Sequence, residues 1–182
     1  MANNCENRVE IYGDVENLKN LHGKLKGVNS LHLDTYSTLF ESVNEDYSWG
    51  SKWQELDVEY YEGEDNMSIY GDSAWGPATG LWEKISKDYN CTVDLKYSEP
   101  GCDIAGTKSW ENGDLVEDTE MTYMDYLYNY DNDYFYDEIG YRSEYTSLDE
   151  LISELGSVYD RLSDSEKQRV NEIHENNYQE EE

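Results

Sequence analysis

Basic residues are scarce in this chain. Lys and Arg number 13 in 182 residues, against 42 Asp and Glu, and the formal net charge is −29. A protein of this charge repels nucleic acids and anionic membranes, so we expect no direct nucleic-acid binding and no membrane binding. The same charge attracts the chain to basic grooves on other proteins.

Cysteine is also rare, and its spacing is not that of a metal site. Cys5, Cys91 and Cys102 form no Cys-x-x-Cys pair, which argues against a disulfide framework and a zinc site. The sequence contains no signal peptide and no long apolar run. We therefore expect a cytoplasmic protein that is neither secreted nor membrane-spanning.

Catalytic motifs are missing as well. The three His residues lack metal-ligand spacing, and no Gly-x-Ser-x-Gly, phosphate-binding loop or His-Glu-x-x-His occurs. The stretch 131–133 begins like a calcium loop, but Tyr136 and Arg142 occupy the positions that need Gly and Glu. We expect a protein that is not an enzyme and that holds no metal and no cofactor.

Tyrosine and tryptophan are abundant, at 18 and 5 residues, although Phe is present only twice and the mean hydropathy is −0.95. Disordered acidic chains are poor in aromatic residues, so we expect a folded core in one domain, or one domain with an extension. We interpret Trp49, Trp53, Trp75 and Trp82 as anchors of the core or of loops. A binding role for Trp49 or Trp75 is the alternative interpretation.

The first 110 residues alternate between strand and helix patterns. Cys5 to Tyr12 has strand periodicity, Asp14 can cap the helix that follows, and Pro77 suits the first turn of a second helix. Residues 28–47 fit neither pattern clearly. The order strand, helix, strand, strand, helix, strand predicts an α+β, ferredoxin-like βαββαβ antiparallel sheet with both helices on one face. The expected strands are 5–12, 56–61, 67–70 and 91–97, and the expected helices are 14–25 and 77–89.

The stretch 111–150 interleaves acids with tyrosines, and Arg142 is its only basic residue. Carboxylates and phenols can imitate the phosphates and bases of DNA, so we expect this segment to bind a partner protein. The predicted acidic contacts are Glu111, Asp114, Glu117, Asp118, Glu120, Asp125, Asp131, Asp133, Asp137 and Glu138. The predicted aromatic contacts are Tyr126, Tyr128, Tyr130, Tyr134 and Tyr136.

Residues 111–182 read as an acidic, Tyr-rich extension followed by C-terminal helices. Asn112-Gly113 predicts a hairpin between 107–110 and 115–120. The conformation of 121–146 is left open, whereas Ser147 and Ser163 each cap an expected helix, at 147–155 and 165–173. We expect a ferredoxin-like domain over 1–110 and a second part over 111–182 that packs on it.

Several short blocks resemble the YubB-type ferredoxin-like family of phage and plasmid proteins. The resemblance covers roughly residues 1 to 115, although Asn4 replaces the Trp that is usual in the first block. It implies a ferredoxin-like fold and an origin in a mobile element of a bacterial host, and it supplies no catalytic residues. The blocks are Met1-Ala2-Asn3-Asn4-Cys5-Glu6-Asn7, Trp49-Gly50-Ser51-Lys52-Trp53, Ser73-Ala74-Trp75-Gly76-Pro77 and Glu99-Pro100-Gly101-Cys102-Asp103-Ile104-Ala105-Gly106.

The size, the acidity and the phage-like N-terminal part together resemble the type II-A anti-CRISPR proteins, which inhibit Cas9. The resemblance implies a protein that binds Cas9 or the Cas9–guide RNA complex in its basic nucleic-acid groove and blocks DNA binding or cleavage. Two alternatives remain. One is a DNA mimic directed at a restriction enzyme, a nucleoid protein or a repair nuclease. The other is an acidic ferredoxin-like module with no inhibitory role.

Overall fold

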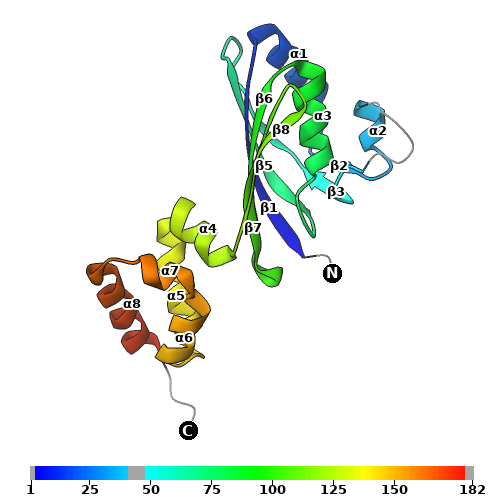
Figure 1. The fold of residues 1–182 in the computed structure, drawn as a ribbon. Helices are drawn as coiled ribbons and strands as arrows, with labels where there is room; N and C mark the ends of the chain where they lie inside the picture. Colours follow the sequence, from blue (N-terminus) through cyan, green and yellow to red (C-terminus); the bar gives the residue numbers. More distant parts are fainter. Residues whose placement is uncertain (1–2, 41–47, 179–182) are drawn as a thin grey trace. The chain divides into compact units, whose positions relative to one another are not determined.

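The structure is a computed structural model that describes residues 3–40 and 48–178. The chain divides into two compact units, Met1–Met121 and Thr122–Glu182. The first unit is an antiparallel sheet with helices, and the second is helical (Figure 1). The division falls after Met121 rather than after residue 110, because the hairpin that contains 111–121 pairs with the sheet.

The first unit has the ferredoxin-like topology expected from the sequence. Its sheet has the order β2-β3-β5-β1-β6-β7-β8, with β4 also paired to β5. The middle of the sheet has the antiparallel strand order of a βαββαβ unit. In this order β3 or β4 comes first, followed by β5, β1 and β6. The elements are β1 (Asn4–Tyr12), α1 (Val15–Leu25), β2 (Ser30–His32), α2 (Tyr36–Leu39), β3 (Trp53–Glu55), β4 (Asp57–Glu59), β5 (Asn66–Ala74), α3 (Thr79–Tyr89), β6 (Thr92–Glu99), a 3-10 turn η1 (Pro100–Cys102), β7 (Ile104–Glu111) and β8 (Asp114–Met121).

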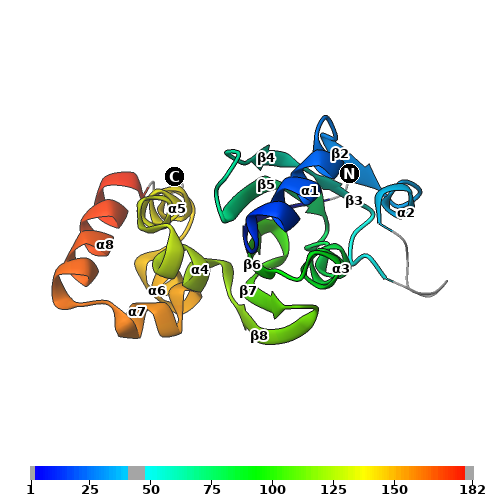
Figure 2. The same cartoon turned by 90° about the horizontal axis from the view of Figure 1, so that it is seen from above.

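Alternation along β1 assigns the two faces of the sheet. Its odd-numbered residues from Cys5 to Ile11 are buried, and its even-numbered residues are exposed or half-buried. Leu18 of α1 and Trp82 of α3 are fully buried in the same core as Val9. Both helices therefore cover one face of the sheet, as Figure 2 shows from above, and leave the other face without a helix from this unit.

The segment around residue 56 differs from the expected single strand over 56–61. Two short strands, β3 and β4, flank Leu56, whose backbone N–H donates to Asn29 O at 2.9 Å instead of to a strand partner. Leu56 is buried in the core, so the chain turns inward at this point. Of the ambiguous stretch 28–47, residues 41–47 lie outside the described residues.

The second unit consists of helices around a small apolar core. Ser147 and Ser163 form capping boxes with Glu150 and Glu166, which confirms both expected helix starts. Phe135, Ile139 and Leu151 are fully buried. The helices are α4 (Tyr123–Tyr130), α5 (Asn132–Ser143), α6 (Leu148–Leu155), α7 (Ser157–Arg161) and α8 (Asp164–Asn177). Within the described residues, none of the helices is long and apolar enough to cross a bilayer.

Candidate functional site

The structure divides the ten predicted acidic contacts between the two units. Glu111, Asp114, Glu117, Asp118 and Glu120 lie on β7 and β8. The other five belong to the helical unit: Asp125 lies on α4, Asp131 lies between α4 and α5, and Asp133, Asp137 and Glu138 lie on α5. The sequence analysis treated these ten acids as one continuous segment, but they belong to two different units of the structure.

Two of the five predicted aromatic contacts are core residues. Tyr126 and Tyr136 are only 5% and 6% exposed, so they are not available as surface contacts. Tyr136 packs against Phe135 and lies under the Arg169 guanidinium, 3.6 Å from the ring centroid. The sequence did not reveal this burial, because acids surround both tyrosines along the chain.

The other predicted tyrosines are more accessible. Tyr130 and Tyr134 are exposed, whereas Tyr128 is half-buried under the Arg161 guanidinium. Two acids of the same helices are engaged locally: Asp125 pairs with Arg161, and Glu138 pairs with Arg142 at 2.9 Å. These ion pairs reduce the charge that the helical unit presents to a partner.

The helix-free face of the sheet carries a larger group of carboxylates. Residues opposite each other on neighbouring strands share a face, so the strand register extends the even-numbered side of β1 across the sheet. We call this set of side chains the carboxylate face. Its members are Glu6 and Glu10 of β1, Asp57 and Glu59 of β4, Asp72 of β5, Asp94 of β6, Glu111 of β7, and Asp114 and Glu117 of β8.

Hydroxyl groups hold several of these carboxylates in place. Ser68 donates to Glu10 at 2.7 Å, and Ser109 donates to Asp94 at 2.5 Å. The Thr107 hydroxyl donates to Glu117 at 3.1 Å. Side chains fixed in this way lose less conformational entropy when a cationic partner binds.

Cations are few on this face. Arg8 pairs with Glu6 at 3.1 Å, and Lys96 lies opposite Arg8 on β6. Tyr12 and Tyr70 project from the same side and are 45% and 38% exposed. The combination of carboxylates and phenols that the sequence placed in 111–138 thus also occurs on the sheet.

The β8 strand is the edge of the sheet on this side. It pairs with β7 from Ala105↔Met121 to Glu111↔Asp114, and the described residues add no strand beyond it. Every residue from Asp114 to Glu120 is exposed, including Leu115 and Val116. Lys108 pairs with Asp118 on the opposite side of the hairpin from Glu117.

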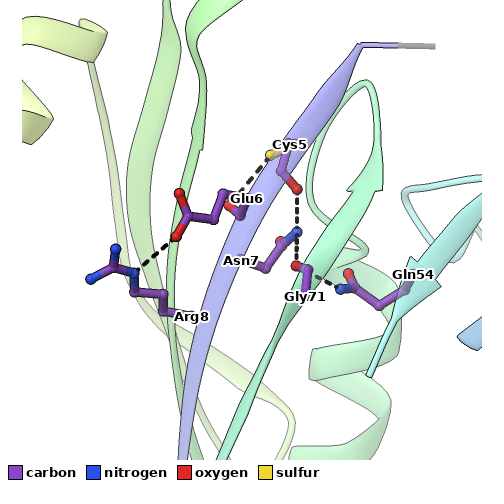
Figure 3. Close-up of polar contacts among 6 residues, drawn as sticks. All are labelled: Cys5, Glu6, Asn7, Arg8, Gln54 and Gly71. Carbon is purple, nitrogen blue, oxygen red and sulfur yellow. Dashed lines mark hydrogen bonds and ion pairs between the residues drawn. The ribbon is translucent and has the colours of Figure 1, made fainter. Parts of the chain in front are cut away.

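A buried polar network lies on the helix-covered face, between β1, β3 and β5. The Asn7 amide donates to Cys5 O at 2.7 Å and shares Gly71 O with the Gln54 amide (Figure 3). It also donates to Ser73 Oγ at 2.8 Å. These bonds satisfy backbone carbonyls at the place where β3 and β4 are interrupted. The network fixes the sheet at this point.

The described residues contain no group of three or more His, Cys, Asp or Glu arranged to hold a metal ion. Cys5 and Cys91 are buried free thiols, and Cys102 is exposed. Burial raises the pKa of the Cys5 thiol to about 12 and that of Cys91 to about 11. Neither buried thiol carries the low pKa of a nucleophile.

The fold and the matched region now establish the family. Residues 48–138 match the family described as "Ferredoxin-like domain in Api92-like protein". The chain belongs to this family. The match runs from β3 through the β7–β8 hairpin into α5, so it includes the two strands that extend the sheet beyond the βαββαβ unit.

One solved structure is similar to part of the chain. The protein api92 from Yersinia pseudotuberculosis, whose family is DUF1281, shares 21% identity over 48% of this chain, with a TM-score of 0.34. The matched part is 29% of the api92 chain, so this chain spans less than a third of that protein. No curated protein matched the sequence.

The sequence analysis missed most of the carboxylate face, although a signal was present. Glu6 and Glu10 alternate with buried residues on β1, and Asp94 does so on β6. Strand alternation predicts one polar side for each strand, but it gives no register between strands. Only the paired sheet shows that these polar sides form one surface.

Proposed function

We propose that this protein binds a basic, nucleic-acid-binding surface of another protein and blocks it. The carboxylate face is the observation that supports the proposal. It presents nine carboxylates and two cations, and one of the cations, Arg8, already pairs with Glu6. Opposite charges across an interface accelerate association and select the partner.

The dimensions of the face suit a nucleic-acid groove. One row of opposed residues crosses six strands, from Glu59 on β4 through Glu10 and Asp94 to Glu117 on β8. At about 4.8 Å between strands, the row spans roughly 24 Å, which is the rise of about seven base pairs of B-DNA. A groove that holds a short duplex could accept this row of charges.

We propose a Cas9-type nuclease loaded with guide RNA as the first target. Such an enzyme holds its heteroduplex in a positively charged channel and reads its short DNA motif with arginines. The net charge of −29 favours this channel over free nucleic acid. The family membership is compatible with this target but names no partner.

The test is a DNA-binding and cleavage assay with a purified Cas9–guide complex at about 0.15 M salt. We expect the wild-type protein to inhibit DNA binding. A triple charge reversal of Glu59, Glu111 and Glu117 to Lys should weaken inhibition at least about tenfold, because the lysine at each of these exposed positions repels the basic channel. A second variant should reverse Asp131, Asp133, Asp137 and Glu138 to measure the contribution of the helical unit.

The matched control is the triple reversal of Asp34, Glu64 and Glu83 to Lys. It changes the net charge equally, and these three exposed acids lie outside the carboxylate face. Retained inhibition by the control and loss by the face variant would support the proposal. Equal effects of both variants would contradict it, and a wild-type protein that inhibits no Cas9 would exclude the Cas9 target.

A further inference from the structure

A hollow of about 340 Å³ lies where two tryptophan-containing loops of the sheet unit meet. It uses motifs that the proposed function leaves unexplained. Trp49 is 6% exposed, whereas Trp75 is 51% exposed. The lining residues are Leu33, Ser48, Trp49, Gly50, Ser51, Lys52, Ala74 and Trp75.

Trp75 is held in an unfavourable backbone conformation. Its φ is +69°, a region that residues with a side chain seldom adopt. Hydrogen bonds on both sides impose it: Trp75 N–H donates to Asn3 O at 3.0 Å, and Ser73 Oγ donates to Gly76 O at 2.8 Å. Strain that the surroundings impose in this way is concentrated at ligand-binding sites.

The opposite wall of the hollow is equally fixed. A Cβ at Gly50 would lie 2.8 Å from Pro77 O and from Thr79 N, so the 48–52 loop can approach this turn only with glycine. The Ser51 hydroxyl both donates to Ala74 O and accepts from Ala74 N. The Trp49 ring stacks on Tyr36, with centroids 5.0 Å apart. The two walls therefore exist before any ligand binds.

The charge of the hollow is opposite to that of the chain. Among the described residues, its lining contains Lys52 and no acid, although the chain has 42 acids. The other two described hollows each contain carboxylates, Glu55 and Asp57 in one and Asp137 and Glu144 in the other. Across the described residues, Lys52 forms no ion pair with a carboxylate.

We propose that this hollow binds a planar aromatic anion. The exposed Trp75 indole stacks on the aromatic ring, since stacked and tilted ring pairs are favourable beyond the area that they bury. Trp49 and Ala74 form the apolar floor. Lys52 pairs with the negative group of the ligand, which is a carboxylate, sulfonate or phosphate. Rigid walls reduce the entropic cost of binding.

The test uses two fluorescent probes of similar shape on the full chain: the anion 8-anilinonaphthalene-1-sulfonate and the neutral N-phenyl-1-naphthylamine. We expect one saturable site for the anion. Trp75→Ala should weaken both probes about tenfold or more. Lys52→Ser should weaken the anion about threefold to fivefold and leave the neutral probe unchanged.

Controls exclude unfolding and general surface binding. Trp75→Gly removes the indole and relieves the strained φ, so loss of binding in that variant, with an unchanged or higher unfolding temperature, supports the proposal. Tyr61→Ala and Lys26→Ser alter an exposed tyrosine and an exposed lysine elsewhere and should bind as wild type. Binding that survives Trp75→Ala, or equal effects of Lys52→Ser on both probes, would overturn it.

Discussion

Single residues decide where the sheet of this protein can bend. Gly71 lies inside β5 with φ +149°, and a Cβ there would lie 2.4 Å from Glu55 O. The amides of Asn7 and Gln54 both donate to the Gly71 carbonyl. The break between β3 and β4 therefore depends on a residue without a side chain.

The change Gly71→Ala should destabilise the sheet unit by about 3 kcal/mol, because the new methyl group collides with backbone that cannot move freely. Chemical denaturation followed by tryptophan fluorescence measures the difference. Gly63→Ala is the control, since its φ is also positive but no atom lies within 4 Å of a Cβ there. A loss at Gly71 no larger than that at Gly63 would contradict the role of close packing.

Position 75 should reverse the usual ranking of alanine and glycine. Both substitutions remove the indole, but only glycine adopts φ +69° without steric cost. Trp75→Gly should therefore be about 1 kcal/mol more stable than Trp75→Ala. Urea denaturation of the two variants measures this difference, and a more stable alanine variant would show that the backbone is not strained.

Thiol reactivity tests the burial of Cys5 and Cys91 and the raised pKa of Cys102. A hydrogen bond with the Glu99 side chain raises the pKa of the exposed Cys102, and burial raises the pKa of Cys5 and of Cys91. One thiol per native chain should react with Ellman's reagent, and its rate should keep increasing above pH 9, since the thiolate forms late. Cys102→Ser should abolish this reaction, and Glu99→Gln should accelerate it. Fast reaction of a second thiol would contradict the burial of Cys5 and Cys91.

At the scale of elements, the sequence predicted those parts whose signal is local. The alternation in β1, the Asp14 cap of α1 and the Asn112-Gly113 turn all lie within a few residues, and the structure confirms each of them. The β3–β4 break was not predictable, because it depends on Leu56 contacting Asn29 and on Gly71 in another strand.

The same limit applies to the candidate site: sequence neighbours could be read directly, but contacts between residues far apart in the sequence could not. Tyr126 and Tyr136 looked like surface residues because acids surround them in sequence. Their burial arises from packing between helices that the residue pattern of 121–146 did not define. Conversely, Glu10 and Asp94 became neighbours only through the register of β1 with β6.

The last helix depends on its N-terminal cap. The Ser163 hydroxyl accepts from Glu166 N–H, and the Glu166 side chain accepts from Ser163 N–H at 2.7 Å. Ser163→Ala should cost about 1 kcal/mol, measured by the helical circular dichroism signal during thermal unfolding.

Lowering the pH should cause part of the loss of stability that we expect for Ser163→Ala. Hydrogen bonds from Ser163 lower the pKa of Glu166 in the folded state. The stabilisation is therefore present above the unfolded pKa of Glu166 and is lost as pH falls through its lowered folded value. Ser163→Ala should show a smaller loss of stability in acid than wild type, and an equal loss would contradict the reciprocal cap.

For the whole molecule, the dominant quantity is the excess of acids. A charge of −29 keeps copies of the chain apart and weakens any interaction with free nucleic acid. It also makes association with a basic partner sensitive to salt. The hollow at Trp75, whose described lining residues include no acid, is an exception, so we expect these residues rather than the net charge to select its ligand.

Because β8 is an exposed edge strand, the negative charge of the chain affects its tendency to aggregate. Within the described residues the outer edge of β8 pairs with no further strand, and the strand contains no proline. Acids at Asp114, Glu117, Asp118 and Glu120 are what separate two such edges at neutral pH. At about pH 3, Asp and Glu side chains in general are protonated, so the repulsion between carboxylates weakens next to Leu115 and Val116.

Acidified solutions should therefore form edge-to-edge fibrils, detected by thioflavin T and by electron microscopy. Val116→Lys should retain a charge at that pH and delay fibril formation, while Val15→Lys, at an exposed valine of α1, should not. Equal rates for the two variants would show that another segment starts the assembly. The acidity of this small protein would then have two effects. It would favour binding to a basic partner, and it would prevent self-association of the chain in solution.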